Sequence, residues 1–197
     1  MSLDTLLALA AAGLEPLEER HPPVTDDAFR GAMRHLAGAV SIVTAGLGAE
    51  RNGLTATSVV SLSADPPTVL VCVNRSASAW PLLVRHAHFG INVLAASQHP
   101  IADRFAGRNG EKGEARFAGA RWIQLASGAP ILADALVAFD CTLEERIQRH
   151  SHDILIGRVQ ALHGIGGTGG APGTGGAPGT DPLLYWRGAY GAIRPTV

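Results

Sequence analysis

The chain has 197 residues, of which 46% are hydrophobic, and its formal net charge at pH 7 is −1. A chain of this size and composition can bury one sizeable core, so we expect one compact domain with appended segments. The near-neutral charge excludes the basic footprint that binding to nucleic acid or to an anionic membrane requires.

Neither the cysteines nor the first residues carry a signal for a metal or for export. Cys72 and Cys141 lie in apolar, strand-like contexts without metal-ligand spacing, so we expect buried free thiols. The apolar stretch Met1–Gly13 contains Asp4 where a signal peptide has basic residues, and it is too short to span a bilayer. We therefore expect a cytoplasmic protein without membrane association.

An N-terminal arm, residues 1–25, precedes the main domain that we expect over residues 26–197. Leucines at helical spacing predict a short helix over residues 2–19, and His21–Thr25 ends it because residues before proline disfavour the helical conformation. This arm either packs on a second subunit or a partner, or is loosely ordered. The pattern does not decide between these alternatives.

The remaining elements are mostly strands. A helix is predicted over residues 25–36, with Thr25 as its N-cap. A strand at 39–45, a hydroxyl-rich strand after Gly53 and its partner at 68–73 predict an antiparallel meander. Further helices are expected at 78–86 and 98–105, and further strands at 89–94, 121–125, 135–146, 153–163 and 183–186. Many strands with few short helices favour a closed or nearly closed antiparallel barrel.

A repeated Gly-Gly-Ala-Pro-Gly-Thr hexapeptide occupies residues 169–180, inside a glycine-rich loop at 166–180. Its composition is that of a flexible linker that can bridge two strand ends. A neutral loop expansion is the favoured interpretation, with a mobile lid as the alternative.

Small hydroxyl residues interrupt the apolar pattern of the strand after Asn52–Gly53. They are Thr55, Thr57, Ser58, Ser61 and Ser63. A strand that only filled a core would carry valine, isoleucine or leucine there. Short hydroxyls beside backbone N–H groups suit a phosphate and the polar edge of a ring. The alternative is an edge strand with solvated serines and threonines.

A second polar cluster lies where the strand at 68–73 runs into a predicted helix. Arg75 offers a planar fork for phosphate, Ser76 and Ser78 offer hydroxyls, and a helix start presents N–H groups. Simple helix capping by Ser78 is the alternative. Asn92 lies mid-strand among apolar neighbours, so its amide either contacts a ligand or satisfies neighbouring strands.

Two histidine pairs, His86 with His88 and His150 with His152, lack accompanying acidic or cysteine ligands, so we expect no metal site. A histidine at a barrel mouth can instead line a substrate pocket.

Taken in order, these clusters resemble the flavin reductase family that supplies reduced flavin to two-component monooxygenases. The similarity covers residues 27–191. The matching segments are Phe29–Met33, Gly38–Thr44, Gly53–Ser63, Asp65–Pro67, Asn74–Ser78, Asn92–Leu94, Gln98, Arg104–Gly107, Gly128–Leu132, Cys141, His152, Ile156–Val159 and Pro182–Tyr185.

The resemblance implies a mainly β fold with short helices, the six-stranded antiparallel Greek-key split barrel that binds FMN. It implies a homodimer that reduces FMN, with FAD possible as substrate, using NADH or NADPH, and that supplies a partner oxygenase. The implied activity is that of an NAD(P)H-dependent flavin reductase. A flavin-binding electron carrier or sensor without turnover is the alternative.

The resemblance also assigns roles to residues. His152 would lie beside the nicotinamide, Asn92 would complete the ring pocket, and Thr55, Ala56, Thr57 and Ser58 would line the flavin ring and its ribityl edge. The ribityl-phosphate side would be held by Asn74, Arg75, Ser76 and Ser78. The sequence departs from the family's Gly-Asp-His motif, because His150-Ser151-His152 stands in its place.

Overall fold

The computed structural model describes residues 4, 7, 11, 23–164 and 181–193. They belong to two units, Met1–Arg34 and His35–Val197. The predicted helix at 2–19 lies almost entirely outside the described residues, as does the whole of the glycine-rich loop at 166–180.

Helix α2 (Asp26–Met33) is the described element of the first unit. Thr25 caps it as predicted, because the Thr25 hydroxyl oxygen accepts a hydrogen bond from the Ala28 N–H at 3.2 Å. Asp26 and Asp27 in the first turn complement the helix dipole. The helix ends three residues before the predicted end at Leu36.

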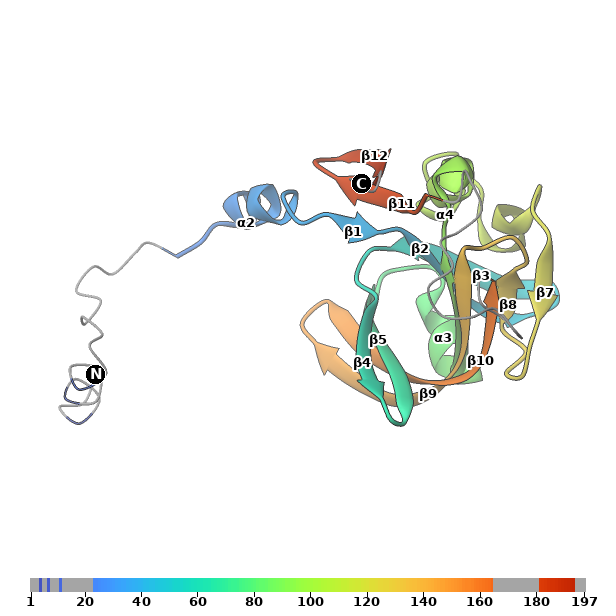
Figure 1. Ribbon diagram of the computed structural model, residues 1–197, viewed down its shortest axis with the longest axis horizontal. Coiled ribbons are helices and arrows are strands. Elements are labelled where there is room, and N and C mark those ends of the chain that lie inside the picture. The colour runs from blue at the N-terminus through green and yellow to red at the C-terminus, as the bar shows by residue number, and fades with distance from the viewer. Residues whose placement is uncertain (1–3, 5–6, 8–10, 12–22, 165–180, 194–197) are drawn as a thin grey trace. The chain divides into compact units, whose positions relative to one another are not determined.

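The second unit is built on a curved antiparallel sheet (Figure 1), which has seven strands among the described residues instead of the expected six. The order across the sheet is β3-β2-β6-β9-β10-β5-β4. The strands are β2 (Ser41–Leu47), β3 (Glu50–Ala56), β4 (Val60–Ala64), β5 (Pro67–Asn74), β6 (His88–Val93), β9 (Val137–Arg149) and β10 (His152–Gly164).

Smaller elements surround this sheet. Strand β1 (Gly38–Ala39) forms a second sheet with β11 (Leu183–Trp186) and β12 (Ala189–Ala192), and β7 (Trp122–Gln124) pairs with β8 (Pro130–Leu132). The helical segments are α3 (Trp80–His86), α4 (His99–Phe105) and two 3-10 turns, Ala96–Gln98 and Gly113–Phe117. None of the helices in the described part of the chain is long and apolar enough to cross a membrane.

The predicted meander is wrong at the hydroxyl-rich segment. This segment is not one strand, because β3 ends at Ala56 and β4 begins at Val60, and the two lie at opposite edges of the sheet. Strand β3 pairs with β2, whereas β4 pairs with β5. Residues 57–59 therefore cross from one edge of the sheet to the other.

Strand β2 is buried on both faces and divides the core in two. Because successive side chains point to opposite faces of a strand, Ile42 packs with Phe105 and Phe117, while Val43 packs with Phe89 and other residues of the second cluster. The two clusters lie on either side of the sheet's centre and hold α4 and α3 respectively. Helix positions beside the sheet thus follow from this alternation.

Two glycines permit close approaches in this core. A Cβ on Gly53 would lie 2.7 Å from the Phe105 ring and 2.7 Å from the Val43 carbonyl oxygen. A Cβ on Gly157 would lie 2.4 Å from the Phe89 ring. Glycine at 53 therefore lets α4 pack directly on β3, at one edge of the sheet.

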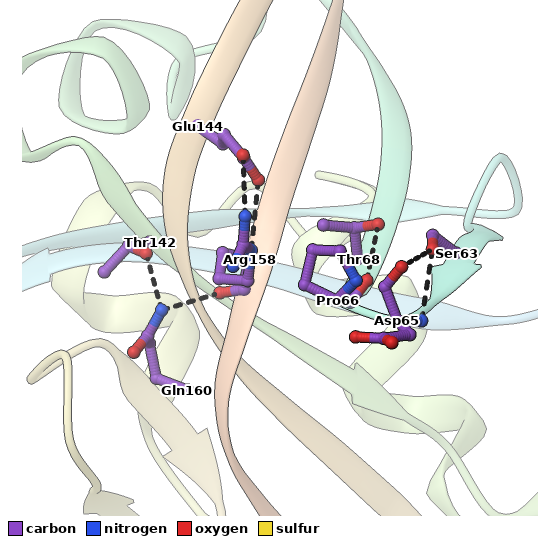
Figure 2. A network of polar contacts seen from close by, with 8 residues as sticks. All are labelled: Ser63, Asp65, Pro66, Thr68, Thr142, Glu144, Arg158 and Gln160. Carbon is purple, nitrogen blue, oxygen red and sulfur yellow. Dashed lines mark hydrogen bonds and ion pairs between the residues drawn. The ribbon is translucent and has the colours of Figure 1, made fainter.

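The long β9–β10 hairpin carries polar pairs on its outer face (Figure 2). Arg158 of β10 binds Glu144 of β9 through two hydrogen bonds of 2.9 and 3.2 Å, and Gln160 donates to the Thr142 hydroxyl at 2.9 Å. Ser63 stays local, because its hydroxyl donates to the Asp65 carbonyl at 3.0 Å in the β4–β5 turn. The Ser63 hydroxyl therefore stabilises the β4–β5 turn.

The two cysteines are free thiols, with Cys141 buried and Cys72 half-buried. Burial, together with nearby Asp140, raises the pKa of Cys141 to about 12. The Cys141 thiol thus stays protonated and serves as a small apolar side chain.

His86 and His88 face each other at the junction of α3 and β6. Ala87 between them is left-handed (φ 52°), and the ring centroids are 5.5 Å apart. Both Nε2 atoms are buried without a hydrogen-bond partner among the described residues. Burial lowers the pKa of His88 below 6.5, and His86 lowers it further, while Asp140 acts in the opposite direction.

Acidification should destabilise the protein through His88. Because its pKa is lowered in the folded state, the unfolded chain takes up this proton at a higher pH. The stabilisation is therefore present above pH 6.5 and is lost as the pH falls through the lowered folded pKa. Between about pH 7.5 and about pH 5.5, the melting temperature of His88→Gln should fall less than that of the wild type. Equal falls would contradict this assignment.

Candidate functional site

Ser58, in the segment that connects β3 to β4, binds the backbone of β5. Its hydroxyl donates to the Cys72 carbonyl at 3.0 Å and accepts from the Cys72 N–H at 3.2 Å. Two residues before Cys72 on β5, Leu70 pairs with Val60 of β4. The Ser58 side chain thus replaces the missing strand neighbour beside Cys72. The Ser58 hydroxyl, which was predicted to face a ligand, thus bonds to the β5 backbone instead.

The residues before Ser58 line a cavity of about 220 Å³. Thr55, Ala56 and Thr57 form one side of it. The remaining lining residues come from β1–β2, the end of α4 and the β11–β12 hairpin: Val40, Ala106, Arg108, Tyr185 and Tyr190. The Thr55 hydroxyl donates to the Ala102 carbonyl at 2.6 Å, which fixes α4 against β3. Thr57 is exposed.

The two tyrosines give this cavity an aromatic wall. Tyr185 and Tyr190 are register partners on β11 and β12, with ring centroids 5.5 Å apart in an edge-on arrangement. The Arg108 guanidinium lies 5.2 Å from the Tyr190 ring centroid and is bound to Asp103 at 2.8 Å. Burial raises the pKa of Tyr190, so the phenol stays neutral and the wall keeps its apolar character.

The turn between β5 and α3 holds the second predicted cluster. The Asn74 side-chain oxygen accepts from the Ser76 N–H at 2.9 Å and from the Ser76 hydroxyl at 2.8 Å. The Arg75 N–H donates to the Ser151 carbonyl at 3.0 Å, which joins this turn to the β9–β10 hairpin. Asn74, Arg75 and Ser76 are all exposed.

Ser78 is not the helix cap that the alternative interpretation required, because Ala79 occupies that position. The Ser78 hydroxyl instead accepts from the Asn52 side-chain amide at 3.2 Å and from Arg116 at 3.5 Å. Together with the Ser58–Cys72 pair, the Asn52–Ser78 bond ties segment 52–58 to segment 72–78 at both ends. Thr55–Thr57 lie between these two ties.

His152 lies at the same end of the sheet as the β5–α3 turn, because it is the register partner of Asn74. Its ring is exposed, and Nδ1 lies 2.9 Å from the Ser151 hydroxyl oxygen. Ser151 stands at the acidic position of the family motif, so a neutral hydroxyl contacts this imidazole where the family pattern has a carboxylate.

Asn92 of β6 lies on the other side of β2 from Thr55, because both pair with Ile42. It is fully buried; its amide donates to the Ile42 carbonyl at 3.0 Å, and its oxygen accepts from the Leu132 N–H at 2.7 Å. The side chain thus holds β6 to β2 and β8, which is the strand-satisfying alternative. The amide also donates to the Thr44 hydroxyl at 3.4 Å, so it has no donor left for a ligand.

Several residues around the site were not predicted as site residues. Arg116 follows a glycine-rich loop and donates to the Gly53 carbonyl at 2.8 Å, while Arg108 and Tyr190 reach the cavity from distant segments. Asn52 precedes the predicted hydroxyl-rich strand and was given no role. Tyr185 ends a segment that matches the family, which was the one available signal.

Known proteins are similar to this chain in sequence and in fold. A flavin reductase-like domain matches residues 33–194. The chain belongs to the flavin reductase family. Among curated members, FMN reductase (NADH) RutF 2 of Methylorubrum extorquens strain PA1 is 49% identical over 145 residues, covering 74% of this chain and 83% of the relative.

Solved structures of family members share the fold. BorF, the flavin reductase component of a bacterial two-component tryptophan halogenase, is 29% identical with a TM-score of 0.73, covering 87% of this chain and 100% of BorF. The NADH:FAD oxidoreductase SgcE6 of Streptomyces globisporus is 28% identical with a TM-score of 0.73, covering 91% of this chain and 100% of SgcE6.

Replacing Ser58 should lower the stability of the protein, because it removes the bonds between Ser58 and β5. Ser58→Ala removes the partner of both Cys72 backbone groups, which should lower the free energy of unfolding by about 1–3 kcal/mol. Ser61→Ala, an exposed hydroxyl on β4, is the control and should change it by less than about 0.5 kcal/mol. Chemical denaturation measures both, and equal small effects would refute the role of Ser58.

Proposed function

We propose that this chain is an NADH-dependent flavin reductase that reduces FMN by hydride transfer. One observation carries the proposal: Asn52 and Ser58 bond segment 52–58, whose Thr55–Thr57 line the cavity, to the segment that ends in the exposed polar turn after β5. The choice of NADH and FMN rests on the relative from Methylorubrum extorquens, which is named an FMN reductase (NADH). FAD and NADPH are the alternatives to be assayed.

The residues fit a flavin in two parts. The cavity offers small side chains on one wall and the rings of Tyr185 and Tyr190 on another, which suits a planar aromatic ring. The exposed groups of Asn74, Arg75, Ser76 and Ser78 suit the ribityl-phosphate side. Ser58 fixes segment 55–57 through its bonds to Cys72, and Asn92 holds together the strands behind the site.

The bound flavin and nicotinamide supply the electron chemistry of hydride transfer. The protein's task is to bind and orient them. Segment 55–57 is rigid because Thr55 is bonded to α4 and Ser58 to β5. His152 stands beside the phosphate-side turn, where its imidazole would contact the nicotinamide, and the Ser151 hydroxyl sets the orientation of its ring. Preorganisation of this kind favours reaction without an acid–base pair.

The proposal extends to assembly and to fold type. Val60, Leu62 and Leu162 are exposed apolar residues, and Leu162 lines an apolar cavity of about 350 Å³ with residues of β4, β5 and β9. An exposed apolar surface of this kind is typical of a protein–protein interface, so we propose that a second copy covers it in a homodimer. BorF belongs to a two-component system, so we propose a partner oxygenase that takes up the reduced flavin. The seven-stranded sheet, with Ser58 bonded to its strand β5, would be this family's Greek-key split barrel.

A turnover assay tests the proposed function. Purified protein is mixed with NADH or NADPH and with FMN, FAD or riboflavin, and the absorbance of the reduced nicotinamide is followed. We expect oxidation that requires added flavin and is fastest with NADH and FMN. No oxidation with any of the six pairs would contradict the proposal.

A further inference from the structure

A buried carboxylate lies between two arginines next to the β5–α3 turn. Asp153 of β10 has a side chain only 1% exposed, and its Oδ2 accepts from the Trp80 indole N–H at 2.8 Å. Arg75 approaches with Nε 3.9 Å from Oδ1, and Arg146 of β9 with Nη1 3.7 Å from Oδ2. We call these four residues the Arg75–Arg146 cluster.

The two guanidinium groups of this cluster also share the Trp80 ring. The guanidinium carbon of Arg75 lies 5.8 Å from the ring centroid and that of Arg146 lies 5.9 Å from it. Both distances are within the range of cation–π attraction. One indole and one carboxylate therefore gather two cations at one place on the surface.

The cluster has unused binding capacity. Both carboxylate distances exceed hydrogen-bond length, so neither guanidinium is locked onto Asp153, and Asp153 Oδ1 has no hydrogen-bond partner among the described residues. The arginine side chains are 40% and 39% exposed, so solvent and ligands reach their donors. Two positive charges face one negative charge, which leaves an excess of one positive charge.

We propose that Arg146 joins Arg75 in gripping the phosphate of the bound nucleotide, and so selects phosphate-bearing ligands. This inference rests on the proposed function, in which the β5–α3 turn holds a phosphate. Two guanidinium forks held on one ring match the planar, charged recognition that phosphate favours. Asp153 and Trp80 act as positioning residues, because they hold the two forks side by side without consuming their donors.

The phosphate has two sources that share this chemistry, the flavin and the dinucleotide NADH. Arg75 follows Asn74, whose register partner is His152, so both proposed ligands would lie at this end of the sheet. A purely structural role is the rival interpretation. It predicts lower stability on loss of Arg146, without a difference between ligands that carry a phosphate and those that do not.

The test compares Arg146→Gln with Arg149→Gln. Arg149 lies on the same strand and is exposed, but its guanidinium bonds to the Gln148 carbonyl, so it controls for the general loss of one positive charge. The first arm titrates FMN and riboflavin, which lacks the phosphate, by flavin fluorescence. The second arm measures KM for NADH and for the phosphate-free donor dihydronicotinamide riboside, with riboflavin as acceptor. Melting temperatures of all variants confirm folding.

We expect Arg146→Gln to weaken one phosphate-bearing ligand about tenfold and its phosphate-free counterpart less than about twofold, with Arg149→Gln near wild type. Loss confined to FMN assigns the flavin phosphate, and loss confined to NADH assigns the dinucleotide. Equal losses for both members of each pair, no loss, or the same loss in Arg149→Gln would overturn the proposal. The binding arm needs no turnover, so an inactive wild type refutes the proposed function alone.

Discussion

The fold of the candidate site depends on one side chain, the Ser58 hydroxyl, which binds both backbone groups of Cys72. Strand β4 begins at Val60, opposite Leu70, so the end of β5 beyond Leu70 has no strand partner on that side. The Ser58 hydroxyl bonds to Cys72 in place of a strand neighbour. It is small enough to let residues 57–59 cross from β3 to β4. The crossing places Thr55–Thr57 against the cavity and leaves β5 free to continue into its polar turn.

Most of the hydroxyl groups that the sequence predicted to bind a ligand instead form hydrogen bonds within the protein. Thr55 holds α4, Ser58 holds β5, Ser63 shapes a turn, and Ser76 bonds to Asn74. Their value for ligand binding is therefore indirect. Thr55 and Ser58 fix segment 55–57, so that a ligand would meet a preformed wall of the cavity at little ordering cost.

The sequence predicted local structure well and long-range placement poorly. The Thr25 cap, β5 and α3 follow from capping, alternation and proline position, which act over a few residues. The break at residues 57–59 could not be predicted, because it depends on Cys72, a partner fourteen positions away. Short strands such as β8 and β12 have too few residues for a periodic pattern. The proposed role of Arg146 could not be predicted from its sequence neighbours, because it depends on contacts with Asp153 and Trp80 on other elements.

The central claim is that segment 55–57 and the β5–α3 turn form one flavin site. A crystal structure of the protein grown with excess FMN tests it most directly. We expect the flavin ring in the cavity beside Thr55–Thr57 and the phosphate against Asn74–Ser78. Flavin bound elsewhere on the protein, or a cavity without flavin at saturating FMN, would contradict it.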